Sequence, residues 1–293
     1  MNNQLALLER LEQVGQQEGV NSTSLDNIVV VRESEPHAGI QTVYEPFLVA
    51  VGKGVKYCYV GEQKYEYRAG SGLVVLLPMP VQTEIVGATP DNPFLAAVMA
   101  LNLDRLSDLL LQIERAEGFP KQPTMEDMSG IFSLSLTDDL IRPILRLFEA
   151  MESVRDTAVL SPLILDEIHY RLLCHEQGAA LRTLLHQRGH IQRITRAVDH
   201  IHQNLDKPVS VAALAEMVHM SRATFYEHFK TVMHVSPLQY AKSMKLFEAR
   251  KFIQAGKNAS EAGYLVGYNS PAQFSREYKR HFGYTPSATG AAV

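Results

Sequence analysis

The sequence is poor in residues that several classes of protein require. It contains 2 cysteines, Cys58 and Cys174, among 293 residues, too few for a disulfide framework or a clustered-cysteine zinc site, so both are expected to be free thiols. Only one histidine, His37, precedes His169. Metal-dependent barrel enzymes bring several histidines and a carboxylate to one ion. This scarcity therefore predicts no metal site, no cofactor and no catalytic residues.

Long apolar runs are also missing. The longest, GLVVLLP and FLAAVMAL, have the length of strands and are too short to span a bilayer. The N-terminal segment MNNQLALLERLEQVGQQ alternates apolar and charged residues at helical spacing and lacks the apolar core of a signal peptide. These patterns predict a cytoplasmic protein with no membrane partner.

Charge is unevenly distributed along the chain. The formal net charge is −4, yet residues 189–293 hold 13 Lys plus Arg against 7 Asp plus Glu, and residues 1–188 hold 15 against 25. A chain of this length is expected to form two domains. The asymmetry predicts a boundary at 188/189, with an acidic domain before it and a basic domain after it that meets a polyanion such as nucleic acid.

The basic domain contains an internal repeat. VHMSRATFYEHFKTVMHVSP, from residue 218, matches VGYNSPAQFSREYKRHFGYTP, from residue 266, and a shift of 49 places Ser221 on Ser270 and Phe225 on Phe274. Each copy predicts a short helix, a tight turn and a second helix opened by a capping serine, which is the pattern of a helix-turn-helix unit. Gly283 is the expected end of the second copy's last helix.

A stiff helix is expected between the two copies. The segment SPLQYAKSMKLFEARKFIQAG, which begins at Ser236, predicts a capped helix of about five turns. Such a helix can hold two recognition helices about 34 Å apart, in successive major grooves on one face of DNA. The alternative is a purely structural helical array.

Residues 190–286 resemble the DNA-binding domain of the AraC/XylS family of bacterial transcription regulators. The resemblance rests on VSVAALAEMVHMSRATFYEHFK, KLFEARKFI and VGYNSPAQFSREYKRHFGYTP. It implies a sequence-specific regulator, an activator of the helix-turn-helix class, whose partners are a double-stranded DNA operator and RNA polymerase. His234 stands where the family has a helix-ending glycine, so it is expected to adopt the left-handed conformation. Gly263 replaces the usual alanine.

The same resemblance implies which side chains contact DNA. The family pattern selects positions on both recognition helices, to which the opening turn of the first adds Arg222 and Thr224. The predicted base contacts are Arg222, Ala223, Thr224, Tyr226, Glu227, Ala272, Gln273 and Arg276. Their chemistry suits base edges, because arginine pairs with guanine, glutamine with adenine and glutamate with cytosine. The predicted phosphate contacts are Ser221, Lys230, Ser270, Lys279 and Arg280. The alternative for each is a solvated helix face.

The acidic domain reads as short strands separated by glycine and proline, typical of a small barrel or sandwich. Residues 25–115 resemble the cupin-like N-terminal domain of AraC-type regulators, through YEPFLVAVGKGVKY, YEYRAGSGLVV and ATPDNPFLAAVMAL. The expected fold class is therefore α+β: an N-terminal cupin-like β-barrel with flanking helices, and a C-terminal all-α domain of two helix-turn-helix units joined by a linker helix. The resemblance implies a small-molecule effector in the first domain. The alternatives are a protein-docking module and a cupin enzyme fused to a DNA-binding domain.

Two further features have two interpretations each. Cys58 is either a small buried residue or a sensor thiol, and its strand, KYCYV, leaves open which face points inward. After the barrel, an expected helix carries an apolar stripe, whose members are Leu106, Leu109, Leu110 and Ile113. The family resemblance implies that this helix forms a homodimer, whereas packing on its own barrel is the alternative.

Overall fold

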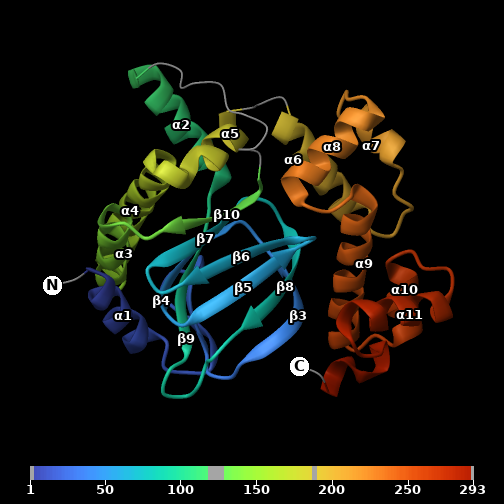
Figure 1. The fold of residues 1–293 in the computed structure, drawn as a ribbon, viewed down its shortest axis with the longest axis horizontal. Helices are drawn as coiled ribbons and strands as arrows, with labels where there is room; N and C mark the ends of the chain where they lie inside the picture. The colour runs from blue at the N-terminus through green and yellow to red at the C-terminus, as the bar shows by residue number, and fades with distance from the viewer. Residues whose placement is uncertain (1–2, 118–128, 187–189, 292–293) are drawn as a thin grey trace.

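The computed structural model describes residues 3–117, 129–186 and 190–291. A β-rich N-terminal region lies beside an all-helical C-terminal region (Figure 1). The predicted α+β fold class is confirmed. The proposed boundary at 188/189 lies outside the described residues, between α5 (Ala179–His186) and α6 (His190–Gln203).

Two antiparallel sheets form the N-terminal region. The larger has the strand order β1-β2-β9-β4-β7-β10 and the smaller has the order β3-β8-β5-β6. No ladder joins one sheet to the other within the described residues, so the expected barrel is open at its seams. The strands are β1 (Gly19–Ser22), β2 (Ile28–Glu33), β3 (His37–Tyr44), β4 (Phe47–Lys53), β5 (Val55–Val60), β6 (Gln63–Arg68), β7 (Ser71–Val75), β8 (Met79–Ile85), β9 (Phe94–Ala100) and β10 (Ile131–Ser135).

Alternation along the strands separates an inner face from an outer face. On β5, Cys58 and Val60 are fully buried, whereas Tyr57 and Tyr59 point outward, where Lys64 lies over the Tyr57 ring at 3.7 Å. This settles the facing that the sequence left open. Burial raises the pKa of the Cys58 thiol to about 12, so the thiol stays protonated and the buried structural interpretation is favoured.

Helices flank the sheets on the side away from the C-terminal region (Figure 1). Leu7 and Leu11 of the first helix are buried, and this helix packs on β4 and β9. The helices of the N-terminal region before α5 are α1 (Asn3–Val14), α2 (Leu103–Glu117), α3 (Asp138–Ala150), α4 (Val154–Cys174) and the short 3-10 turn η2 (Glu176–Gly178). None of the helices described is long and apolar enough to cross a membrane.

The C-terminal region is built around one long helix, α9 (Pro237–Gln254). In Figure 1 it runs vertically, with α6, α7 and α8 at its upper end and α10 and α11 at its lower end. The predicted linker helix is thereby confirmed. The other elements of this region are α7 (Val211–Met217), α8 (Arg222–Met233), α10 (Ala259–Leu265), α11 (Pro271–Phe282) and the 3-10 helix η3 (Pro286–Ala291).

Candidate nucleic-acid interface

The first helix-turn-helix unit consists of α7 and α8. The Ser221 hydroxyl accepts a hydrogen bond from the Thr224 backbone N–H at 3.1 Å, which caps α8 as the sequence predicts. Phe225 and Phe229 are fully buried, with ring centroids 5.7 Å apart. The aromatic face therefore fixes α8 against its neighbours and leaves the opposite face to solvent.

The second unit, α10 and α11, repeats this construction. The Ser270 hydroxyl accepts from the Gln273 backbone N–H at 3.3 Å, and α11 ends at Gly283, both as expected. Phe274 and Tyr278 are buried, and the Tyr278 hydroxyl lies 2.8 Å from the Thr289 hydroxyl of η3. The segment after Pro286 thus closes the base of this unit.

Left-handed residues stand at the same two places in both units. His234 ends α8 with φ 57°, as predicted, where Gly283 ends α11 with φ 85°. His219, in the turn before α8, has φ 54°, and a shift of 48 places it on Gly267, with φ 83°. The sequence analysis missed His219, although this alignment with a glycine was a usable signal.

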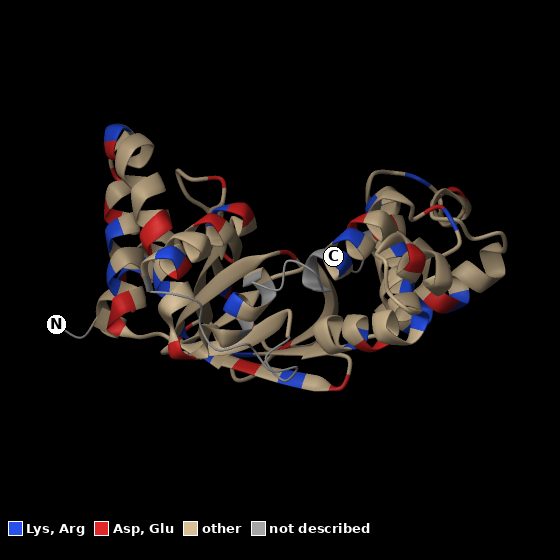
Figure 2. Cartoon of the chain, turned by 90° about the horizontal axis from the view of Figure 1, so that it is seen from above, with Lys and Arg blue, Asp and Glu red and all other residues tan. Residues whose placement is uncertain are grey.

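All of the predicted base contacts are exposed on α8 and α11: Arg222, Ala223, Thr224, Tyr226, Glu227, Ala272, Gln273 and Arg276. The phosphate candidates Lys230, Lys279 and Arg280 are exposed as well. The hydroxyls of Ser221 and Ser270 serve as helix caps. Both signs of charge occur on the helices of the C-terminal region, on the right in Figure 2.

One acidic residue of α11, Glu277, was not singled out from the sequence. Its carboxylate accepts hydrogen bonds from Lys242 Nζ at 2.9 Å and from the Tyr268 hydroxyl at 2.8 Å, while Gln273 Nε2 donates to it at 3.4 Å. Burial alone would raise the pKa of Glu277, but these donors lower it. The carboxylate therefore stays charged and orients Gln273 on the exposed side of α11.

The first unit is docked on the N-terminal region through the end of α8. His234 Nε2 lies 3.0 Å from the Tyr65 hydroxyl and 2.9 Å from the Ser129 hydroxyl, and burial lowers the pKa of this histidine. The Gly130 backbone N–H donates to the Val232 carbonyl at 3.0 Å. A Cβ at Gly61 would lie 2.2 Å from the His234 carbonyl oxygen. The two backbones are thus in direct contact.

Helix α9 adds a second anchor near its start. The Tyr240 hydroxyl donates to the Pro78 carbonyl at 2.9 Å and lies 2.7 Å from His202 Nε2 of α6. Burial raises the pKa of Tyr240, so the phenol remains a donor. The hydrogen bond links the linker helix to the loop before β8.

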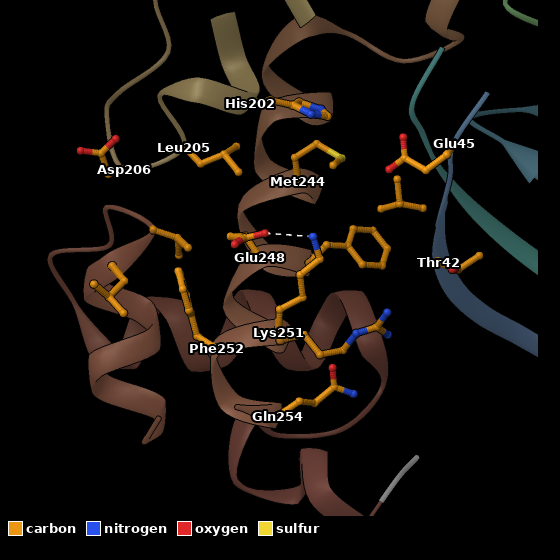
Figure 3. A pocket seen from close by; sticks show the side chains of 15 residues that line it. Thr42, Glu45, His202, Leu205, Asp206, Met244, Glu248, Lys251, Phe252 and Gln254 are labelled. Atoms are coloured by element: carbon orange, nitrogen blue, oxygen red, sulfur yellow. Dashed lines mark ion pairs between the residues drawn. The ribbon is translucent and has the colours of Figure 1, made fainter. Parts of the chain in front are cut away.

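Further along α9, a cleft of about 600 Å³ separates the helix from β3. Glu45 and Thr42 line it from the N-terminal side, and Glu248 pairs with Lys251 across one turn of α9 at 3.1 Å (Figure 3). Arg250 Nη1 donates to the Gln41 carbonyl at 3.2 Å. Contact between the second half of α9 and the sheets is therefore sparser than at its start.

A separate cavity of about 480 Å³ lies between the two sheets. Its walls are mainly valine and phenylalanine, and its polar groups include Glu33, His37 and Lys56. Lys56 Nζ and His37 Nε2 each lie 2.7 Å from a Glu33 carboxylate oxygen. This cavity is the candidate ligand site of the N-terminal region.

The predicted dimerisation stripe lies on α2. Leu106 and Leu110 are buried, while Leu109 and Ile113 are partly buried against the same core. Arg105 pairs with Asp166 of α4 through two hydrogen bonds at 2.7 and 2.6 Å. Because the stripe packs on its own domain, a dimerisation role for these four leucine and isoleucine side chains stays a prediction.

Comparison with known proteins gives a family match for each of the two regions. Residues 24–180, more than half of the chain, match the family model of the AraC-type transcriptional regulator N-terminus, and residues 214–292 match that of a helix-turn-helix domain. The chain is 26% identical over 196 residues to the virulence regulon transcriptional activator VirF of Yersinia enterocolitica, which covers 67% of this chain and 69% of VirF.

Two further similarities differ in extent. The probable transcriptional regulator LumQ of Photobacterium leiognathi is 32% identical over 90 residues, 30% of this chain, and the chain spans only 36% of LumQ. The crystal structure of unsaturated fatty acid bound ToxT from Vibrio cholerae has a similar fold, with a TM-score of 0.56 and 12% identity, covering 92% of this chain and 96% of ToxT. From the match of its N-terminal region and the repeated units that follow, the chain belongs to the AraC-type transcriptional regulators.

Proposed function

We propose that the protein is a sequence-specific transcription regulator that binds an operator with both helix-turn-helix units. The observation that carries this proposal is the repetition: two recognition helices with the same serine cap and the same buried aromatic pair, each with its polar face exposed. Both recognition helices are attached to the same long helix, α9, which can hold them in successive major grooves. In this role the protein has no catalytic residue, and it acts in the cytoplasm.

The proposed base readers keep the roles expected from their chemistry. Arg276 pairs with a guanine, Gln273 with an adenine and Glu227 with a cytosine. Arg222, Ala223, Thr224, Tyr226 and Ala272 complete the set, and Lys230, Lys279 and Arg280 neutralise phosphates. Since the caps Ser221 and Ser270 already use their hydroxyl oxygens as acceptors, their DNA contact is through hydroxyl donation to phosphate.

We further propose that a small-molecule effector binds in the cavity between the sheets. ToxT, which has a similar fold, was crystallised with an unsaturated fatty acid, which supports ligand binding by a protein of this fold. The cavity borders β3, and the first unit docks on β6 and on the turn between β5 and β6 of the same sheet. An effector that favours one arrangement of these strands shifts the placement of α8, and so changes operator affinity.

The active form is proposed to be a homodimer that recruits RNA polymerase. Both elements rest on the family. The dimer is tested by sedimentation of the purified protein over a range of concentrations, with Leu109→Lys and Ile113→Lys as variants of the two half-buried stripe positions. Loss of a dimer in both variants supports the α2 surface, and an unchanged dimer places the contact elsewhere.

The first experiment is selection of bound sequences from a random DNA pool by the full-length protein, followed by affinity measurements at two salt concentrations. Two recognition elements about one helical turn apart are expected, with a specific affinity at least about a thousand-fold above that for random DNA. Weak binding that depends steeply on salt and selects no sequence would contradict sequence-specific reading.

A further inference from the structure

The cavity between the sheets has inward-facing walls that are mostly apolar. On β2, Ile28 and Val30 are fully buried on the face of the sheet away from the cavity. Val29 and Val31 point toward the cavity and are only half-buried. Side chains that point into a packed interior are normally inaccessible, so the accessible surface of these valines is the wall of a real cavity. With Phe47 of β4, they form a surface suited to hydrocarbon.

The cavity also contains three ionisable groups in contact. Glu33, on the inward face of β2 with the valines, accepts hydrogen bonds from Lys56 Nζ and from His37 Nε2, each at 2.7 Å. Lys56 Nζ also lies 5.5 Å from the Phe94 ring centroid. The ammonium of Lys56 is matched by the carboxylate of Glu33.

Hydrogen-bonding positions remain free beside this triad. In the tautomer whose Nε2 donates to Glu33, Nδ1 of His37 is an acceptor, and it is buried without a hydrogen-bond partner in the described part of the chain. The hydroxyls of Tyr44 and Tyr67 lie 2.8 Å apart. One of the two protons is used between them, which leaves the other for an oxygen in the cavity. Burial raises the pKa of both phenols, so both keep their protons.

A charged ligand fits this arrangement poorly. A carboxylate would have to share Lys56 with Glu33, and two carboxylates at one site repel each other. An ammonium would face Lys56 in the same way. A hydroxyl meets neither conflict, since it can donate to His37 Nδ1 or accept from the Tyr44–Tyr67 pair.

We infer that the cavity takes an uncharged, mainly apolar small molecule that carries a hydroxyl group. This inference rests on the proposed effector site and adds its chemical class. The triad then acts as a charge filter: Glu33 excludes anions and Lys56 excludes cations, while the apolar walls bind the hydrocarbon part of the ligand.

The test compares three probes with one tail and different head groups: octanol, octanoate and octylammonium. Binding to the full-length protein is measured by titration calorimetry near neutral pH. Octanol is expected to bind at least about ten-fold more tightly than either ion, because an unmatched charge in a buried site costs more than a factor of ten. Equal or tighter binding of octanoate overturns the inference, and so does the absence of any octanol binding.

Substitutions in the triad should weaken its discrimination against charged probes. Glu33→Gln leaves Lys56 without its carboxylate, so octanoate affinity should rise at least about ten-fold with little change for octanol. Lys56→Met should do the same for octylammonium. Glu62→Gln, at the exposed tip of the β5–β6 hairpin, is the control and should change nothing. An unchanged ranking in the folded Glu33→Gln protein contradicts the filter.

If circular dichroism shows that a triad variant does not fold, the relative affinities of the three probes for the wild-type protein decide whether the inference stands. The DNA selection experiment is run without any probe, so its result is independent of the ligand. Failure of the charge filter alongside a recovered operator motif would overturn the ligand class and leave the proposed DNA-binding function intact.

Discussion

The two helix-turn-helix units have the same internal design but different supports. Phe225 and Phe229 of the first unit belong to one continuous hydrophobic core with the two sheets. Phe274 and Tyr278 of the second unit form a separate core with α10 and the second half of α9. A sequence repeat therefore need not produce equivalent packing: the first unit shares the core of the N-terminal region, whereas the second keeps a core of its own and meets that region where α11 contacts β3.

The residue types at the left-handed positions follow the same division. The second unit uses glycine at both places, whereas the first uses His219 and His234. His234 contacts Tyr65 and Ser129 of the N-terminal region, while His219 is exposed. A histidine in this conformation costs about 1 kcal/mol more than glycine, so His234 is explained by docking. Nothing in the structure explains His219.

The largest expected effect comes from breaking the docking of the first unit. Gly61→Ala places a Cβ 2.2 Å from the His234 carbonyl oxygen, at φ 59°. Gly87→Ala is the matched control, since Gly87 has φ 70° and nothing within 4 Å of such a Cβ. We expect the free energy of unfolding to fall by about 3 kcal/mol or more for Gly61→Ala and by about 1 kcal/mol for Gly87→Ala. Denaturant titration measures both, and equal losses would mean that the docked arrangement does not persist in solution.

The next largest effect is expected on α11, the recognition helix of the second unit, which is proposed to read DNA bases. Arg276→Ala should weaken operator binding by about 1 to 3 kcal/mol and relax the preference at one base pair. Lys279→Ala should instead weaken binding to all sequences alike and reduce the salt dependence. Binding to a set of operator variants at two salt concentrations separates the two effects. An unchanged base preference in Arg276→Ala would remove its assigned role.

Stability should also depend on pH through His281 of the second unit. Burial and the nearby Arg250 lower the pKa of His281 to about 4. The unfolded chain, with a histidine pKa of about 6.5, therefore takes up the proton first as pH falls. The folded state is fully stabilised above about pH 6.5 and loses about 1 to 2 kcal/mol from this residue by about pH 5.

Denaturant titrations between pH 7 and pH 5 test this dependence. His281→Leu, which cannot be protonated, should flatten the pH profile, whereas His200→Gln, at an exposed position of α6, should leave it unchanged. His169, His202 and His234 contribute in the same direction, because burial lowers the pKa of each. A profile that His281→Leu leaves as steep as before would contradict the assignment.

The smallest effect separates the two left-handed histidines of the first unit. His219→Gly should stabilise the protein by about 1 kcal/mol, because glycine adopts φ 54° without strain. His234→Gly relieves the same strain but loses the contacts to Tyr65 and Ser129, so no net stabilisation is expected. Thermal unfolding of both variants measures the difference, and equal stabilisation would show that the His234 side chain contributes nothing.

The sequence predicted local structure well because local signals determine it. The serine caps at 221 and 270, the end of α11 at Gly283 and the left-handed His234 all depend on residues within one turn. The facing of β5 was not predictable, because Lys56 looked like a surface residue. Its place inside the cavity depends on Glu33, a partner 23 positions away.

The candidate site was predicted only as a set of exposed side chains. The docking of α8 could not be foreseen, since it depends on backbone contact between Gly130 and Val232 and on the absent side chain of Gly61. Neither leaves a pattern in the sequence. The apolar stripe on α2 had two possible partners of equal chemistry, and periodicity alone cannot choose between them.

Helix α9 can be considered as a lever. Its 18 residues make a rod roughly 27 Å long, held to the sheets near one end by Tyr240 and, beside the cleft near the other end, by the hydrogen bond from Arg250 to Gln41. A tilt of roughly 10° about the Tyr240 end displaces the far end by roughly 5 Å on this length. Successive base pairs are about 3.4 Å apart, so a tilt that breaks the Arg250–Gln41 hydrogen bond at the far end is enough to move the second recognition helix past one base pair.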